Sequence, residues 1–448
     1  MNERKINMKT KCLAVGIILL FIGTCVVPAI AQNTEKSQST LKWNWLYVGG
    51  SGPGNYTKIQ HAVDNASDGD SIYVYHNQSP YYENIIVHTS INLIGEDKNT
   101  TIIDGSGQLS SGDAVRIDSD WVNVSDFTIQ NSRKSPPNGI KINHSSHNTI
   151  TSTIIKQNYY GITISANSNY NTISNNILLN NTWGITIFHY SNFNVIINNN
   201  VTKNKGGVEL FNHSDFNNII NNTITQNENC NGIHLDSCDN NTISSNTILN
   251  NYVDSISLIL CDNNTISDNI ITNGFNGILV RHSDNTTVSE NTITNNTYHG
   301  VNIVYSKSIS IINTTIANNT RNGIHMTYSD FNTIAYNTIV NNNNSGVFLE
   351  CSNETGITRN TISKNSYGIH LLLSNDIIIR KNNFVKNMKD ALFNTSKKNT
   401  WNHNYWSRPR IFPKLIFGQL MVGSFQMPWI NIDWYPAKQP YDIPRISL

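Results

Sequence analysis

The sequence predicts an all-β chain that folds as a parallel β-helix, a solenoid whose coils each contain three short strands. Two markers, one glycine and one serine, repeat in a single register at steps of 22 to 25 residues. Each repeat also holds three short runs in which apolar and polar residues alternate, bounded by Asn, Ser, Asp or Gly. Such runs are typical of strands, and stacking them buries apolar residues that one coil alone leaves exposed. We expect about fifteen coils.

The two markers define columns that should run along the solenoid. The glycine column is Gly139, Gly161, Gly184, Gly207, Gly232, Ser255, Gly277, Gly300, Gly323, Gly346, Gly368 and Asp390. The serine column is Ser145, Ser168, Ser191, Ser214, Cys238, Cys261, Ser283, Ser306, Ser329, Ser352, Ser374 and Ser396. A leucine-rich repeat would need a different apolar spacing, and a propeller blade would need about 40 residues.

Asparagine makes up about one residue in six and concentrates at the expected corners of the coils. Stacked asparagines can bond along the solenoid, and their backbone tolerates the left-handed conformation. We therefore expect asparagine ladders at the corners. A prion-like disordered tract would lack this strict period.

The N-terminal segment has the features of a secretory signal. Basic residues precede an apolar run from Cys12 to Val27, and Ala29 and Ala31 offer a small-x-small cleavage site. The run is short for a membrane span, so we expect an extracytoplasmic protein, with membrane attachment only if the signal is retained. The expected divisions are a signal at 1–31, a linker at 32–44, an N-terminal cap with irregular coils at 45–138, regular repeats at 139–396, and a C-terminal cap at 397–448.

Both ends of the repeat region differ from its middle. Apolar residues at helical spacing predict a short helix from Tyr56 to Ala66, covering the open first coil. Strands are expected at 85–87, 91–94, 101–103, 114–117, 122–124 and 127–129. The tail carries four tryptophans and six of the eleven prolines, which predicts an aromatic closing cap. Docking of the tail on an envelope protein is the alternative.

Composition and cysteine usage narrow the partners. The formal net charge is +1 and no basic cluster is present, so nucleic acid is not an expected partner. Several Asn-x-Ser/Thr sites outside the ladders predict a glycoprotein if the host glycosylates exports. Cys238 and Cys261 share one column in adjacent coils, at a spacing that a disulfide accepts; alternatively, two small thiols replace two serines there.

One strand of each coil should present an outward column of polar and aromatic residues that could match an extended polysaccharide. That column is Lys141, Thr163, Thr186, Glu209, His234, Ser257, Leu279, Asn302, His325, Phe348 and His370. The candidate sugar-binding rings are Tyr160, Trp183, Phe188, Phe211, Tyr305 and Tyr328. Glu209, His234 and Asp236 form the candidate catalytic group, because one strand and its neighbour bring a carboxylate and an imidazole within reach of each other for acid and base work. Aromatics are also common on β-rich surfaces for structural reasons.

The segments Asp68–Val74 (DGDSIYV) and Ile91–Gly107 (INLIGEDKNTTIIDGSG), with repeated NTIS and NNTI units, resemble the NosD-type exported β-helix family of the pectin-lyase-like superfamily. The resemblance implies a right-handed solenoid with carbohydrate-binding and sugar-hydrolysis repeats. The family name implies copper delivery, yet the histidines and methionines are too dispersed for one coordination sphere, so we expect no metal and no other cofactor.

The function that the sequence favours is polysaccharide or envelope-glycan binding by an exported protein. Three alternatives stay open: a polysaccharide lyase, hydrolase or epimerase acting through Glu209, His234 and Asp236; a NosD-like accessory protein for copper-site maturation; and a structural surface protein.

Overall fold

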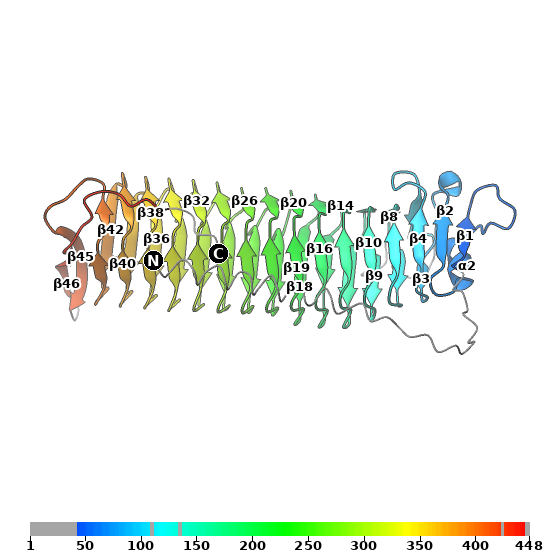
Figure 1. Ribbon diagram of the computed structural model, residues 1–448, viewed down its shortest axis with the longest axis horizontal. Coiled ribbons are helices and arrows are strands. Elements are labelled where there is room, and N and C mark those ends of the chain that lie inside the picture. The colour runs from blue at the N-terminus through cyan, green and yellow to red at the C-terminus, as the bar shows by residue number, and fades with distance from the viewer. Residues whose placement is uncertain (1–42, 108–111, 133–136, 423–424, 444–448) are drawn as a thin grey trace, which may run out of the picture. The chain divides into compact units, whose positions relative to one another are not determined.

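The computed structural model describes residues 43–107, 112–132, 137–422 and 425–443. These residues form one compact unit, an all-β parallel solenoid of about sixteen turns, one more than the sequence indicated (Figure 1). The expected signal peptide, and the linker up to residue 42, lie outside the described residues. Within the described part of the chain, no helix is long and apolar enough to cross a membrane.

Three parallel sheets run along the solenoid, because each strand pairs with the equivalent strand of the next coil. In the described residues the first sheet has 16 strands. In spatial order they are β1 (Trp45–Val48), β2 (Ser71–Val74), β4 (Asn92–Gly95), β7 (Asn123–Ser125), β10 (Thr149–Thr151), β13 (Thr172–Ser174), β16 (Val195–Ile197), β19 (Asn218–Ile220), β22 (Thr242–Ser244), β25 (Thr265–Ser267), β28 (Thr287–Ser289), β31 (Ser310–Ile312), β34 (Thr333–Ala335), β37 (Gly356–Thr358), β40 (Ile378–Arg380) and β43 (Thr400–Asn402).

The second sheet has 14 strands in the described part of the chain. They are β5 (Ile102–Asp104), β8 (Thr128–Gln130), β11 (Ile154–Lys156), β14 (Ile177–Leu179), β17 (Asn200–Thr202), β20 (Thr223–Thr225), β23 (Thr247–Leu249), β26 (Ile270–Thr272), β29 (Thr292–Thr294), β32 (Thr315–Ala317), β35 (Thr338–Val340), β38 (Thr361–Ser363), β41 (Asn383–Val385) and β44 (Tyr405–Trp406).

The third sheet, of 16 strands among the described residues, carries the longest strands and the candidate site. Its strands are β3 (Ile85–Val87), β6 (Val115–Ile117), β9 (Asn138–Asn143), β12 (Tyr160–Ser165), β15 (Trp183–Ile187), β18 (Gly206–Phe211), β21 (Ile233–Asp236), β24 (Ile256–Ile259), β27 (Ile278–Arg281), β30 (Val301–Val304), β33 (Ile324–Thr327), β36 (Ser345–Glu350), β39 (Tyr367–Leu372), β42 (Lys389–Asn394), β45 (Lys414–Val422) and β46 (Phe425–Asp433). The early strands fall within one or two residues of the ranges expected from sequence.

The interior is a continuous stack of mainly Ile, Leu and Val side chains, with one from most strands of the first two sheets and two from most strands of the third, and it includes Ile185, Ile196 and Val201. Each of these three is 0% exposed. Stacking at the strand spacing of about 4.8 Å turns these few residues per coil into one core.

The asparagine ladders are confirmed, and buried side chains form them. In one of them, Asn199 N donates to Asn222 Oδ1 at 2.9 Å, and Asn222 N donates to Asn246 Oδ1 at 2.9 Å. The Asn222 amide also donates to the Ile196 carbonyl at 2.9 Å. Each side chain therefore replaces backbone bonds that a corner would otherwise lose.

The left-handed backbone expected of the ladder asparagines belongs instead to the residue before them. Asn175 is exposed with a φ of 57°, whereas Asn176 is 1% exposed and bonds along the ladder. The outward left-handed position accepts many residue types. At one corner its side chains form an exposed stack of rings, with centroids 4.2 to 5.2 Å apart: Trp121, His147, Tyr170, Phe193 and Phe216.

The glycine and serine columns are both present. A Cβ added to Gly161 would lie 2.4 Å from the Gly184 carbonyl oxygen, so the close approach of successive coils excludes a side chain there. In the other column, Ser145 N donates to Ser168 Oγ at 3.1 Å. Two sulfurs continue that column, with Cys238 N donating to Cys261 Sγ at 3.2 Å.

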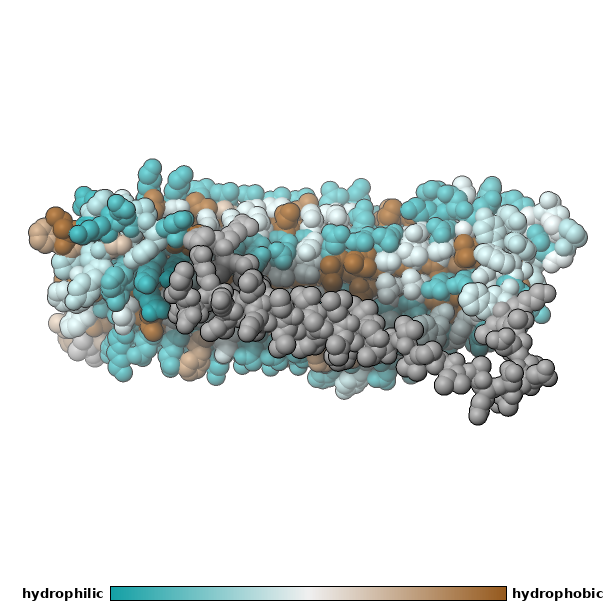
Figure 2. Space-filling model, viewed as in Figure 1, coloured by the Kyte–Doolittle hydropathy of each residue, from teal (hydrophilic) through white to brown (hydrophobic). Residues whose placement is uncertain are grey.

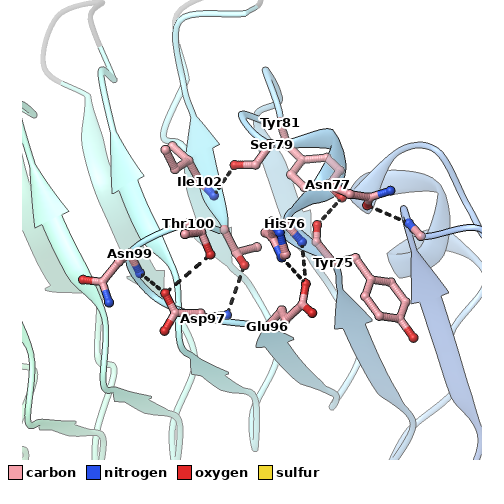
Figure 3. Close-up of polar contacts among 12 residues, drawn as sticks. Tyr75, His76, Asn77, Ser79, Tyr81, Glu96, Asp97, Asn99, Thr100 and Ile102 are labelled. Atoms are coloured by element: carbon pink, nitrogen blue, oxygen red, sulfur yellow. Dashed lines mark hydrogen bonds and ion pairs between the residues drawn. The ribbon is translucent and has the colours of Figure 1, made fainter.

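At the N-terminal end, the helix expected from Tyr56 to Ala66 is much shorter. Only α2 (Ile59–Asp64) is helical, and its first two amides donate to the buried Glu83 carboxylate at 2.9 and 3.0 Å. Figure 3 shows the loops that follow β2 and β4. His76 donates through its backbone N to Glu96 at 2.9 Å, its ring Nδ1 lies 2.5 Å from the same carboxylate, and these contacts lower the pKa of Glu96.

At the C-terminal end, the tail expected to be an aromatic closing cap contains two strands that the sequence analysis did not predict. Strands β45 and β46 pair antiparallel and extend the third sheet beyond β42. In Figure 1 they lie at the end of the solenoid opposite to α2. We call β45 and β46 together the C-terminal hairpin.

Candidate functional site

A hollow of about 790 Å³ lies on the outer side of the third sheet, over β12, β15, β18 and β21. We call it the aromatic hollow. Its lining residues are Tyr159, Tyr160, Trp183, Phe188, His189, Glu209, Phe211, Asn212, Asn229, Cys230, Asn231, His234 and Val253. They include six of the nine binding or catalytic residues proposed from sequence.

Four of the six candidate rings line the hollow, and they come from three successive strands. Phe188 and Phe211 stack with centroids 5.7 Å apart, and Tyr160 meets Phe188 edge-on at 6.0 Å. Trp183 pairs in register with Tyr160 on one side and with Gly206 on the other. These rings are partly exposed, so they offer faces and edges to a ligand.

Gly206 makes room for the Trp183 ring. A Cβ added to Gly206 would lie 2.2 Å from Trp183 Cε3, so the indole rests directly against the glycine. The same added atom would lie 3.1 Å from Glu209 Oε1, which places the carboxyl group beside the indole. The missing side chain thus brings the ring and the carboxyl group together.

Glu209 is 5% exposed, and no hydrogen bond or ion pair reaches its carboxyl group from the described residues. Burial raises the pKa of Glu209 to about 8. A carboxyl group with such a pKa is protonated at neutral pH and can donate a hydrogen bond or a proton.

His234 lies next to Glu209, because the two residues are register partners in β18 and β21. Its ring meets Phe211 edge-on at 5.6 Å, and its Nδ1 is buried without a partner among the described residues. Burial lowers the pKa of His234, although the nearby Asp236 charge and a hydrogen bond with the Ser257 backbone oppose this effect. Glu209 and His234 are therefore both predominantly neutral at pH 7.

Thr186, Glu209 and His234 follow one another in the register of the third sheet. Thr186 Oγ1 is also buried without a partner within the described part of the chain. Buried polar groups are nearly always hydrogen-bonded in proteins. Of these three residues, Glu209 and His234 line the hollow, where a ligand could supply a partner.

The outward column was expected to be exposed, and for several members this is wrong. Thr163 is 4% exposed, Thr186 0%, Glu209 5% and Ser257 1%. At Glu209 the cause is visible, because the Trp183 ring lies over Gly206 and beside the carboxyl group.

The remaining candidate residues lie outside the hollow. Asp236 shares the strand of His234, but it accepts a hydrogen bond from Ser237 Oγ at 2.8 Å and does not line the cavity. Tyr305 and Tyr328 are exposed on later coils, where they stack on each other with centroids 5.1 Å apart, and His282 stacks on Tyr305 at 5.0 Å.

Three residues at the rim of the hollow were not among the site residues predicted from the sequence: Asn229, Cys230 and Asn231. They lie in the loop before β21, within the longest step of the glycine column, the 25 residues from Gly207 to Gly232. That longer step was the available signal, because extra residues in one coil must project from the stack.

Figure 2 shows a face of the molecule that is mostly hydrophilic, with short hydrophobic patches.

In this structure Cys238 and Cys261 are free thiols, which donate to the carbonyl oxygens of Asp236 and Ile259 as the serines of the same column do to theirs. His299 and His325 pack with ring centroids 4.6 Å apart. Yet within residues 43–443, gaps excepted, no three His, Cys, Asp or Glu side chains are arranged to hold a metal ion.

Solved structures share the fold at low identity. A mannuronic-acid-specific family 6 polysaccharide lyase from the human gut microbiota is 12% identical, with a TM-score of 0.51, over 77% of this chain and 87% of that one. Gene product 12 of bacteriophage phi29, in its pre-mature form, is 13% identical, with a TM-score of 0.51, over 78% of this chain and 55% of that one. The A-module of the Azotobacter vinelandii mannuronan C-5 epimerase AlgE6 is 15% identical over 79% and 95% of the two chains, with a TM-score of 0.43. No curated protein matches the chain significantly.

A family model described as "Periplasmic copper-binding protein (NosD)" matches residues 63–269 and 251–411. Its periplasmic description agrees with an extracytoplasmic location. Among the described residues, no group of three or more His, Cys, Asp or Glu side chains fits a copper centre. The matched ranges cover most of the solenoid, and the chain belongs to the NosD family.

Proposed function

We propose that this exported NosD-family protein binds a polysaccharide, and that the aromatic hollow holds one of its sugar units. The observation that carries the proposal is that the buried Glu209 carboxyl group and the neighbouring His234 ring line the hollow below partly exposed aromatic rings. A sugar presents both matching surfaces, since its hydroxyl groups hydrogen-bond and its C–H faces pack on aromatic rings.

The electrostatics favour a neutral sugar unit over a uronate. Glu209 and His234 are the titratable groups of the sheet floor, and burial keeps both predominantly neutral. Neither Lys205 nor Arg281, the cations considered from sequence, lines the hollow. A uronate carboxylate would therefore lose its hydration without gaining an ionic partner there.

Binding should be tested with the chain starting at Gln32 on a glycan array, followed by titration of any glycan retained. Trp183→Ala and Phe211→Ala should each weaken binding about tenfold or more, because stacking on an aromatic ring contributes on the order of 1 kcal/mol or more. Tyr328→Ala is the matched control, since it removes an exposed stacked ring on a distant coil. Equal losses in all three variants, or no glycan retained, would contradict the proposal.

Glycoside hydrolysis is the second candidate, and the raised pKa of Glu209 favours it. Glu209 would donate its proton to the glycosidic oxygen as the bond to the anomeric carbon breaks. Water would add to that carbon, and His234 would take the proton released by the water. An assay for new reducing ends, run on each bound glycan, separates the two functions: release of reducing ends that Glu209→Gln abolishes would establish hydrolysis.

A further inference from the structure

We propose that the C-terminal hairpin docks the protein on an anionic lipid surface. The inference is independent of the aromatic hollow. It rests on apolar side chains that emerge from both faces of the hairpin and on the charge of the segment that contains it.

Among the described residues, the outer face of the hairpin is open and mostly apolar, and the exposed polar side chains on it, Gln419 and Gln426, hydrogen-bond to each other. Leu415 is 43% exposed, Phe417 58% and Met421 41%. Ile430, which pairs in register with Phe417, is 46% exposed and extends the same face onto β46. Cross-strand partners point to one side of a sheet, so these side chains form a single apolar surface.

The inner face is covered only where it meets the last coil. On β45, Ile416 is 2% exposed and Leu420 is 8% exposed. Strand β46 lies beyond β45, at the edge of the sheet, and its inner side chains overhang the solenoid. Met427 is 49% exposed and Trp429 52%, although they pair with Leu420 and Gly418 of β45.

Two-sided exposure favours lipid over a protein partner. A second protein covers one face of a hairpin or adds a strand to its edge, whereas the interfacial layer of a bilayer surrounds both faces. Pro428 lies in the middle of β46 and has no backbone N–H, which opposes pairing of this edge with a second copy. Tryptophan and phenylalanine are also the side chains that the membrane interface favours.

The charge of the segment is of one sign. Residues 408–432 contain Arg408, Arg410 and Lys414 but no Asp or Glu, and the one acid of the hairpin, Asp433 at the end of β46, is 0% exposed. All three cations precede or begin β45, at the end of the hairpin that is far from the turn. Arg408 is exposed, whereas Arg410 and Lys414 are half-buried, and the Lys414 ammonium lies 5.6 Å from the centroid of the Trp406 ring. Basic groups beside an apolar surface add attraction to anionic headgroups.

The test uses the chain starting at Gln32, so that the apolar run of residues 12–27 cannot itself bind lipid. It is mixed with vesicles of phosphatidylcholine alone or of phosphatidylcholine with phosphatidylglycerol, and flotation measures the bound fraction. We expect binding to the anionic vesicles that falls with added salt and is reduced about tenfold or more by the double variant Phe417→Ser, Trp429→Ser.

The matched control is Trp121→Ser, Phe193→Ser, which removes two exposed rings from the corner stack and should leave vesicle binding unchanged. Thermal melting establishes that each variant folds. A second readout needs only a conservative change: phospholipids with brominated chains should quench tryptophan fluorescence of the parent chain, and Trp429→Phe should remove most of this quenching while flotation persists.

Three results would overturn the inference. They are absence of flotation with anionic vesicles, equal flotation of the parent chain and the folded hairpin variant, and concentration-dependent dimers in solution that the hairpin variant abolishes without any vesicle binding by the parent. The last result would assign the apolar faces to a second copy of the chain.

Discussion

The Asp433 carboxylate accepts two hydrogen bonds from Asn404, at 2.9 Å from its backbone N and 3.2 Å from its side-chain Nδ2. Asn404 is the last asparagine of a buried ladder, in which Asn382 N donates to Asn404 Oδ1 at 3.0 Å. Asp433, which is 0% exposed, thus supplies the acceptor that the next coil would otherwise provide. A residue of the hairpin ends a ladder made by the repeats.

Replacing Asp433 with Ala should therefore loosen this end of the solenoid. The change leaves Asn404 N and the indole Nε1 of Trp406 without their acceptor, which should cost about 1–3 kcal/mol for each buried donor. Asp433→Asn is the control, because its amide oxygen keeps one acceptor. Hydrogen exchange should show faster exchange of the Asn404 amide in the Ala variant than in the Asn variant, and equal protection in the two would contradict the assignment.

Adjacent asparagines at one corner should respond differently to substitution. Asn222→Ala removes the acceptor of Asn199 N and the donor to Ile196 O, so we expect the free energy of unfolding to fall by about 1–3 kcal/mol. Asn221 has a φ of 53° and an exposed side chain, so Asn221→Gly should cost less than about 1 kcal/mol. Urea denaturation measures both, and a larger loss at Asn221 would disprove the division of roles.

Glu209 should make stability depend on pH. Burial raises its pKa from the ordinary value of 4.5 to about 8, so between these values the folded state holds a proton that the unfolded state has released. The folded state binds more protons, and its stability therefore falls as pH rises through this window, by at most about 1.4 kcal/mol per pH unit. The contribution is fully present below pH 4.5 and gone above pH 8.

Glu209→Gln tests this dependence, because glutamine is similar in shape and does not ionise. The difference in unfolding free energy between the variant and the parent chain should grow from pH 5 to pH 8. The other titrating groups contribute equally to the unfolding free energies of the variant and the parent chain, so their contributions cancel in the difference. A constant difference across the window would mean that Glu209 is not buried as described.

Gly206 should be essential to the aromatic hollow. A methyl group at this position would meet the Trp183 ring at 2.2 Å, so Gly206→Ala should displace the indole and weaken any glycan binding about as much as Trp183→Ala does. Gly356→Ala is the control, because a Cβ there meets nothing within 4 Å. Glycan titration measures the change in binding, and tryptophan fluorescence measures the displacement of the Trp183 ring. Unchanged binding in Gly206→Ala would mean that the Trp183 indole does not contact the ligand.

The paired cysteines should be replaceable by the residue that fills the rest of their column. Both thiols are buried, and burial raises the pKa of Cys238 far above its ordinary value and that of Cys261 to about 12, so thiol reagents should not modify them in the folded chain. Cys238→Ser, Cys261→Ser should keep the melting temperature within a few degrees. A large fall in melting temperature that appears only under oxidising conditions would instead indicate a disulfide.

Much of the fold follows from the repeat. Because each coil repeats its Gly, Ser and Asn positions, the columns align in a single register, and the register of every central strand follows from that alignment. The sequence did not reveal the C-terminal hairpin, although Gly423-Ser424 between two apolar runs is a two-residue turn signal. The prolines and tryptophans of the tail mask the strand-like alternation of residues 414–422.

What the sequence determined by itself is the part of the structure that depends on period: coil length, inward residues and ladders. Only the tertiary structure shows which outward side chains are buried, because their burial depends on how side chains of neighbouring coils pack against each other. Glu209 is outward by alternation, yet it is buried because Gly206, three residues earlier, lets the Trp183 ring of the previous coil lie beside it. Such a relationship joins residues on different coils through the space that one missing side chain leaves, and no one-dimensional pattern specifies it.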